Sequence, residues 1–227
     1  MQDERPFVVV FAGPNGSGKS SLTRQLLAQG HELGEYINPD DIAADLSGPY
    51  DERVRRAQQI ADDRRADAIS ARRSFSFETV FSHPSKLDVL DQARRAGFEA
   101  ILFFVAVDDP SINVERVKTR VSLGGHDVPA DRIEKRYRRT MALLPEMLAR
   151  VDRAWIFDNT LRTANRQSFA GRLVATVEGG VDRAIAVKVR SPLPTWVAQH
   201  LIEPARTRGW RVEIADGNHP LGAPEKK

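Results

Sequence analysis

Residues 13–20 of the chain read Gly13-Pro14-Asn15-Gly16-Ser17-Gly18-Lys19-Ser20. This stretch matches the pattern G-x-x-x-x-G-K-[ST], in which a glycine-rich loop surrounds phosphate groups. Residues 7–11, before it, form an apolar run typical of a buried parallel strand. Residues 21–27, after it, carry apolar side chains at helical spacing. Because strand, loop and helix follow in the required order, the sequence predicts a phosphate-binding site.

The chemistry of this site follows from its residue types. Glycines 16 and 18 lack a Cβ, so the backbone can turn its N–H groups toward a phosphate. The start of the following helix adds a partial positive charge. Lys19 is expected to reach the β- and γ-phosphates, and the Ser20 hydroxyl is expected to bind Mg²⁺. We therefore expect residues 13–20, together with Ser21, to bind a nucleoside triphosphate with Mg²⁺.

Composition limits the possible classes of protein. The chain has 227 residues, 41% of them hydrophobic, which is enough for one α/β domain and a small addition. Its formal net charge is only +3 and 7% of its residues are aromatic, which argues against a nucleic-acid partner. Cysteine is absent, which excludes disulfides and thiolate metal sites. No apolar run is long enough to span a membrane, so we expect a soluble, cytoplasmic protein without a membrane partner.

The order of elements predicts an α/β fold. Apolar runs at residues 7–11, 35–37, 74–81, 98–107 and 154–159 alternate with helical patterns. This alternation indicates a doubly wound parallel sheet of about five strands, of the P-loop kinase type, with a helical lid. We expect the kinase domain to cover residues 1–180. Residues 181–227 are expected to form a small appendage of unknown role, with an edge strand near 184–189.

Acidic residues at the ends of two predicted strands indicate an acceptor side. Asp40 and Asp41 follow the second strand, and Glu78 and Thr79 end the third. If Asn38 caps the next helix, Asp41 falls where an acid reaches back to the cap, and Asp40 is free to face the cleft as a general base. Glu78 is expected to bind the acceptor or to hold Mg²⁺ through water. Thr79 is either a further substrate contact or an ordinary strand residue.

A basic region, residues 116–139, indicates a lid over the phosphates. Arginine and lysine recur through it, and Gly124 and Gly125 interrupt it as a predicted hinge. Phosphoryl transfer requires cations near the γ-phosphate, often carried by such a lid. We predict that Arg120 and Arg136 act there and that most of the other basic side chains are solvated. His126, in the hinge, is expected to be simply exposed.

Taken together, these motifs resemble the zeta toxin family. The resemblance is carried, in the correct order, by residues 13–20, 38–43, 76–80, 116–121, 124–129 and 136–137. It implies a P-loop kinase fold that uses ATP and Mg²⁺. The activity it implies is phosphorylation of UDP-N-acetylglucosamine at the sugar 3′-hydroxyl. It also implies a possible small antitoxin protein that covers the ATP site.

By position, the resemblance assigns roles to several residues. Lys19 and Ser20 match the phosphate and magnesium residues, Asp40 the general base, and Glu78 and Thr79 the strand that binds the acceptor sugar. Arg120 and Arg136 match the arginines at the γ-phosphate. Other readings stay open: a kinase for a nucleotide, dinucleotide or antibiotic, a nucleotide-dependent switch, and end phosphorylation of RNA or DNA. A switch does not need the pair Asp40 and Glu78, which favours a kinase.

Overall fold

The computed structural model describes residues 5–122, 128–161, 169–180 and 183–215. The eight strands of these described residues belong to one sheet, in the order β2-β3-β1-β4-β5-β6-β7-β8. In chain order the strands are β1 (Phe7–Ala12), β2 (Glu35–Ile37), β3 (Phe75–Thr79), β4 (Glu99–Ala106), β5 (Arg153–Asp158), β6 (Arg172–Gly180), β7 (Arg183–Arg190) and β8 (Arg211–Ala215).

Helices connect the strands. They are α1 (Lys19–Ala28), α2 (Pro39–Asp45), α3 (Tyr50–Ser70), the short 3₁₀ turn η1 (Pro84–Lys86), α4 (Leu87–Arg95), α5 (Pro110–Ser122) and α6 (Ala130–Leu148). A last helical stretch runs from α7 (Thr195–Val197) through a π-helical segment (Ala198–Ile202) to α8 (Glu203–Thr207). Among the helices of the described residues, none has the length and apolar character needed to cross a membrane.

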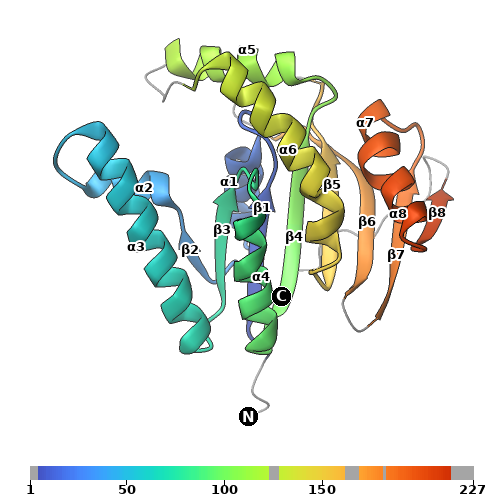
Figure 1. Cartoon of the computed structure of the whole chain (residues 1–227), viewed down its shortest axis with the longest axis horizontal. Coiled ribbons are helices and arrows are strands. Elements are labelled where there is room, and N and C mark those ends of the chain that lie inside the picture. The colour runs from blue at the N-terminus through green and yellow to red at the C-terminus, as the bar shows by residue number, and fades with distance from the viewer. Residues whose placement is uncertain (1–4, 123–127, 162–168, 181–182, 216–227) are drawn as a thin grey trace.

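Strand β1 shows why the sheet is covered on both faces. All six of its side chains are buried, and successive side chains point to opposite faces. Val8 and Val10 pack in the larger core with α4, α6 and the last helical stretch. Val9 and Phe11 pack in a smaller core with the apolar side of α1. Accordingly, α4 and α6 lie in front of the sheet and α1 behind it (Figure 1).

The five strands β2-β3-β1-β4-β5 are parallel, as the sequence predicts. Their carboxyl ends therefore meet at one edge of the sheet, and the phosphate loop follows β1 at that edge. In open α/β sheets this edge is where ligands bind. The predicted fold class, a doubly wound P-loop kinase fold, is confirmed.

Three further strands extend the sheet beyond the expected five. β6 runs antiparallel to β5, β7 runs antiparallel to β6, and β8 runs parallel to β7. The predicted edge strand at 184–189 is therefore an interior strand, and β8 forms the edge. The predicted boundary at residue 180 falls between two strands that pair with each other. Whether residues 181–227 fold or act as a separate unit stays a prediction.

Candidate functional site

The phosphate loop adopts backbone conformations that favour glycine. Gly13 has φ +147°, and a Cβ there would lie 2.0 Å from the carbonyl oxygen of Val105 on β4. Gly18 has φ +107°, and a Cβ there would lie 2.5 Å from the side-chain nitrogen of Asn159. A side chain at position 13 would collide with strand backbone and force the loop away from β4, whereas one at position 18 would strain the backbone and displace the Asn159 side chain. The glycines of the motif therefore allow the loop to lie against the ends of β4 and β5.

Two asparagines hold this loop from outside the motif. Asn113, fully buried on α5, donates its side-chain amide to the carbonyl oxygen of Asn15 at 2.6 Å. Asn159, directly after β5, donates to the carbonyl oxygen of Ser17 at 2.7 Å. The Arg116 guanidinium in turn donates to the carbonyl oxygen of Asn159 at 2.8 Å. Neither asparagine was predicted as a site residue from the sequence. For Asn113 the available signal was a polar residue in the helical segment that connects the strands now seen as β4 and β5.

The start of α1 is open to an anion. Gly18 is its N-cap and provides no side-chain hydrogen bond, and the first turn of this fully described helix contains no acidic residue. The first N–H groups of a helix have no acceptor within the helix and carry its partial positive charge. This end of α1 therefore presents donors to a phosphate, as the motif predicts.

Lys19 lies within the loop. Its ammonium group donates to the carbonyl oxygens of Gly13 and Pro14, both at 2.9 Å. Burial is the main cause that lowers the pKa of Lys19 to about 8, and Arg120 also lowers it, whereas the negative charges of Glu78 and Asp40 raise it. The ammonium group of Lys19 therefore lies within electrostatic reach of Glu78 at the end of β3, of Asp40 after β2 and of Arg120 on the lid helix α5.

Glu78 joins β3 to the phosphate loop. Its carboxylate accepts hydrogen bonds from the hydroxyls of Ser20 at 2.7 Å, Thr23 at 2.9 Å and Tyr36 at 2.7 Å. Burial and the Glu78 charge raise the pKa of Tyr36, so its phenol stays protonated and remains a donor. From the sequence, Glu78 is expected either to bind the acceptor or to hold Mg²⁺ through water. Its contact with Ser20 places it beside the predicted metal ligand.

Asp40 and Asp41 face different spaces. Asn38 caps α2 by accepting a hydrogen bond from the backbone nitrogen of Asp40 at 3.0 Å. The exposed Asp40 lines a cleft of about 1200 Å³ that also contains Lys19, Glu78 and Thr79. Asp41 lines a separate hollow of about 240 Å³ beside Ile42 and Arg64. The cap therefore directs one carboxylate to the phosphate loop and the other away from it.

Thr79 lies at the cleft, but its hydroxyl is partly engaged. The hydroxyl oxygen accepts a hydrogen bond from the backbone nitrogen of Phe81 at 3.1 Å. The hydroxyl hydrogen can still donate to a ligand, so the substrate contact suggested for Thr79 stays a prediction.

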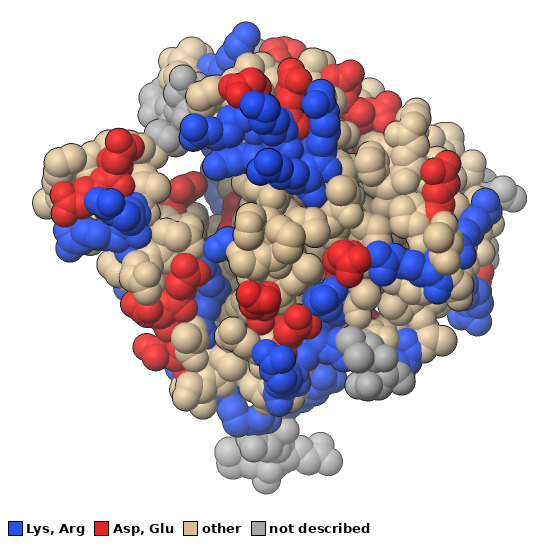
Figure 2. Space-filling view, in the orientation of Figure 1, with Lys and Arg blue, Asp and Glu red and all other residues tan. Residues whose placement is uncertain are grey.

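The lid helices bring several arginines over the cleft. Arg116 and Arg120 on α5, and Arg132 and Arg136 on α6, line it. Burial and the nearby Arg132 lower the pKa of the half-buried Arg136. Lys135 and Arg138, by contrast, pair on the surface with Asp131 and Glu134. Figure 2 shows lysine and arginine gathered over α5 and α6, beside a hollow in the surface. The predicted hinge glycines 124 and 125, and His126, lie outside the described residues.

The fold and the site together are typical of one class of protein. A parallel sheet carries a phosphate loop after its central strand β1, carboxylates stand at neighbouring strand ends, and a pair of arginine-bearing helices covers the cleft. This is the arrangement of a P-loop kinase.

The comparisons identify the family. A model described as "Zeta toxin" matches residues 1–170, about three quarters of the chain, and the chain belongs to this family. An uncharacterized protein of Haemophilus influenzae is 27% identical over 140 residues, which are 57% of this chain and 91% of that protein. The predicted family resemblance is confirmed.

Two solved structures share the fold. The AvrRxo1-ORF1:AvrRxo1-ORF2 structure with sulphate ions has a TM-score of 0.58 and 16% identity, over 77% of this chain and 59% of that chain. This chain therefore matches less than two thirds of that protein. A structure from the PezAT chromosomal toxin–antitoxin system of Streptococcus pneumoniae has a TM-score of 0.51 and 16% identity, over 70% of each chain.

Proposed function

We propose that this protein is an ATP-dependent phosphotransferase that phosphorylates a hydroxyl of a UDP-amino sugar, with UDP-N-acetylglucosamine as the first candidate. The observation that carries the proposal is a single cleft lined by Lys19 of the phosphate loop and by Asp40 of the acceptor side. A switch that only hydrolyses ATP has no need of a carboxylate placed for an acceptor hydroxyl. Family membership supports the UDP-amino sugar.

The residues present fit ATP and Mg²⁺. The loop backbone, the open start of α1 and Lys19 offer donors and charge to the phosphates. The Ser20 hydroxyl is a hard oxygen donor of the kind that Mg²⁺ prefers, and Glu78, whose carboxylate lies 2.7 Å from it, would orient it and could hold the ion through water. Within the described part of the chain no three acidic or histidine side chains gather as a metal cluster, so phosphates and water would complete the coordination. When bound, Mg²⁺ neutralises charge that develops on the phosphates.

In the proposed reaction the acceptor hydroxyl loses one proton and attacks the γ-phosphate of ATP. A bond forms between the acceptor hydroxyl oxygen and the γ-phosphorus, and the bond from that phosphorus to the β–γ bridging oxygen breaks, which releases ADP. Asp40 accepts the hydroxyl proton. Arg120 and Arg136 stabilise the negative charge on the transferring group. Glu78, through Ser20, orients the metal side of the site, and Thr79 contacts the acceptor.

A matched pair of variants tests the proposal. Purified protein is incubated with labelled ATP, Mg²⁺ and a panel of UDP-sugars, nucleotides and dinucleotides. We expect a phosphorylated UDP-amino sugar with the unmodified protein and with Asp41→Asn, and none with Asp40→Asn. All three proteins should bind ATP with similar affinity. Transfer that persists in Asp40→Asn, or ATP hydrolysis without any phosphorylated acceptor, would count against the proposal.

We further propose a small antitoxin protein as partner and the cytoplasm as the site of action. The structural relative from the PezAT toxin–antitoxin system supports such a partner. The test is whether a small protein encoded beside this chain co-purifies with it and blocks nucleotide binding. Nucleotide binding that is unaffected by every such neighbour would contradict this part of the proposal.

A further inference from the structure

The cleft continues beyond the phosphate loop, between α3 and α4. On α3 its wall is formed by residues three or four apart, including Val54, Gln58 and Ile69, which share one face of the helix. On α4 the wall includes Val89 and Gln92. Figure 1 shows α3 and α4 on either side of β3. At a rise of ~1.5 Å per residue, the α3 wall from Val54 to Ile69 is roughly 22 Å long, far longer than one monosaccharide.

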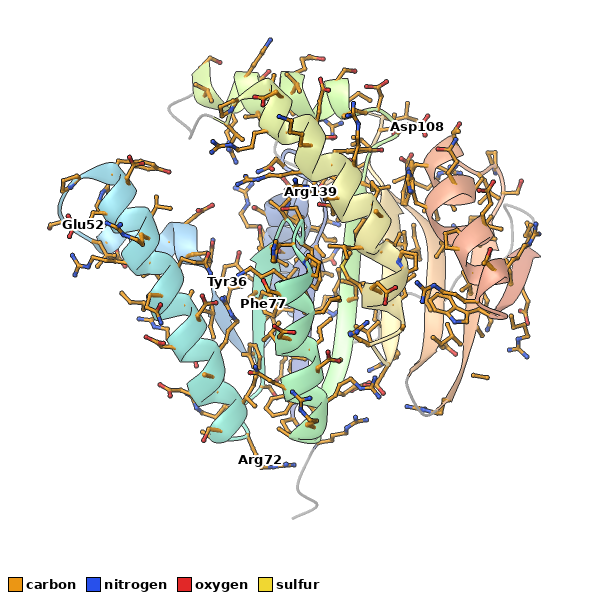
Figure 3. All side chains as sticks on the ribbon, in the orientation of Figure 1. Tyr36, Glu52, Arg72, Phe77, Asp108 and Arg139 are labelled. Atoms are coloured by element: carbon orange, nitrogen blue, oxygen red, sulfur yellow. The ribbon has the colours of Figure 1, made fainter. Side chains whose placement is uncertain are left out.

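The floor of this groove carries an arginine that the proposed chemistry does not use. Arg65 of α3 has a side chain only 8% exposed, and its guanidinium carbon lies 5.1 Å from the centre of the Phe77 ring. Its Nη2 pairs with Asp62 one turn earlier on α3. Figure 3 shows Phe77 between α3 and α4. Burial of a cation is costly, and one carboxylate on the same helix, itself 48% exposed, compensates for it only in part.

The geometry around Arg65 suits an oxyanion. The guanidinium lies on the Phe77 ring, which fixes its plane, and a planar guanidinium can donate two parallel hydrogen bonds to a phosphate. In its ion pair with Asp62, Arg65 uses its Nη2 atom. From the α4 side the groove is lined by Lys86, half-buried at the end of η1, and by the exposed carboxylate of Asp88, so Arg65 is the buried cation of the groove.

The groove and the reacting end belong to one cleft. Arg65 and Phe77 line the same cleft as Lys19 of the phosphate loop and Asp40. Phe77 and Glu78 are neighbours at the end of β3, but successive side chains of a strand point to opposite faces, so the cleft passes around the end of this strand. An acceptor with its hydroxyl at Asp40 can therefore extend along the cleft toward Arg65.

We propose that the groove between α3 and α4 binds the part of the acceptor distant from the reacting hydroxyl, and that Arg65 contacts a phosphate group there. Arg65 is then the residue that selects phosphate-bearing acceptors, such as nucleotides or nucleotide sugars, over neutral sugars. This inference rests on the proposed function, because it assumes that the cleft receives an acceptor.

Paired probes test it on the full chain. The ATP site is first saturated with a non-hydrolysable ATP analogue and Mg²⁺, and binding is measured by calorimetry for UDP-N-acetylglucosamine against N-acetylglucosamine and for UDP against uridine. We expect Arg65→Gln to weaken binding of both phosphate-bearing probes by about 10- to 100-fold. Binding of the two neutral probes and of the ATP analogue should not change. Arg65→Lys should lose less, because it keeps the charge but not the planar fork.

The matched control is Arg64→Gln. Arg64 is the exposed neighbour of Arg65 on α3 and lines the other hollow, so all its affinities should stay as in the unmodified protein. An equal loss for charged and neutral probes would mean that Arg65 is only structural and would overturn the inference. So would unmodified protein that binds UDP no better than uridine. If Arg65→Gln does not fold, Arg65→Lys and the salt dependence of UDP binding decide instead. Phosphate-dependent binding without phosphoryl transfer counts against the proposed function alone.

Discussion

At the scale of single residues, we expect Lys19 to couple nucleotide binding to pH. Burial holds its pKa at about 8. A bound phosphate favours the charged ammonium and so raises this pKa. At pH 8 this group is about half protonated, so we expect ADP binding to take up about half a proton at most, and ADP affinity to fall as the pH rises above about 8. Calorimetry in two buffers with different ionisation enthalpies measures the uptake.

The control for this prediction is Lys19→Arg. Arginine stays protonated throughout the accessible pH range, so the proton uptake at pH 8 should disappear, whatever happens to the affinity. Equal uptake by both proteins would show that another group is responsible.

Glu78 allows a second prediction at this scale. Glu78→Gln keeps the size of the side chain but removes the charge beside Ser20. Because partners that orient a metal ligand typically contribute 10- to 100-fold to metal affinity, we expect the Mg²⁺ requirement for ATP binding to rise about tenfold or more. ATP affinity measured in a chelator should be unaffected. A titration of Mg²⁺ against ATP binding checks this.

The comparison variant is Tyr36→Phe, which removes one of the three hydrogen bonds to Glu78 but leaves its charge. It should cost about 1 kcal/mol of unfolding free energy and leave the Mg²⁺ requirement unchanged. A Mg²⁺ requirement that rises equally in both variants would assign Glu78 a purely structural role.

At the scale of elements, the rotation of α6 selects which arginine can act. Tyr137 donates to the carbonyl oxygen of Val107 at 2.8 Å, and Thr140 donates to that of Val80 at 2.8 Å, which fixes the buried face of the helix. Arg136 then borders the cleft, while Arg138 pairs with Glu134 on the surface, where its side chain is 73% exposed. Two residues on a helix are about 200° apart, so the two arginines point in different directions.

We therefore expect Arg136→Gln to lower kcat by about 10²- to 10³-fold, as loss of one donor to a transition state typically does. Arg138→Gln should stay within about twofold, because an exposed ion pair contributes little. Steady-state kinetics with the acceptor that the panel assay finds checks both variants. Similar kcat values for the two would contradict a catalytic role for Arg136.

At the scale of the whole molecule, the last strands and helices support the nucleotide site. Trp196, 1% exposed, donates its ring nitrogen to Asp158 at 3.0 Å and its backbone nitrogen to Asp108 at 3.2 Å. Thr160 also donates to Asp158, at 2.6 Å. Asn159, whose side chain donates a hydrogen bond to the phosphate loop, lies between Asp158 and Thr160 in the chain. The region beyond the family match thus stabilises the segment that positions the loop.

A shortened chain tests this support. A chain that ends at residue 180 lacks β7, β8 and the helix with Trp196, and leaves β6 as an unpaired edge. We expect it to lose cooperative unfolding and nucleotide binding, whereas a chain that ends at residue 215 keeps both. Thermal denaturation by circular dichroism and ADP calorimetry measure the outcome. A stable 1–180 chain with full ADP affinity would favour the separate appendage.

Much of the architecture could be predicted because it depends on local sequence patterns. The five parallel strands, the phosphate loop and the helix start at Asn38 each depend on neighbouring residues in the chain, through side-chain periodicity and turn chemistry. The rule that ligands bind at the carboxyl ends of parallel strands then brought Asp40 and Lys19 to one cleft. β6 was not predicted, although residues 173–177 form a short run in which Thr176 is the one polar residue, because such a short run does not by itself indicate a strand. Its place in the sheet comes from pairing with β5 and β7.

The family, the parallel part of the sheet and a phosphate-binding loop could all be predicted from the chain alone, since these depend on residue types at short, regular spacing. Which distant side chains meet became visible only in the folded protein. Folding brought Glu78 to Ser20, Asn159 to the loop and Arg65 onto Phe77, and it joined the last three strands to the same sheet. The physical reason is that such contacts depend on packing across elements, where sequence separation carries no information about direction or distance.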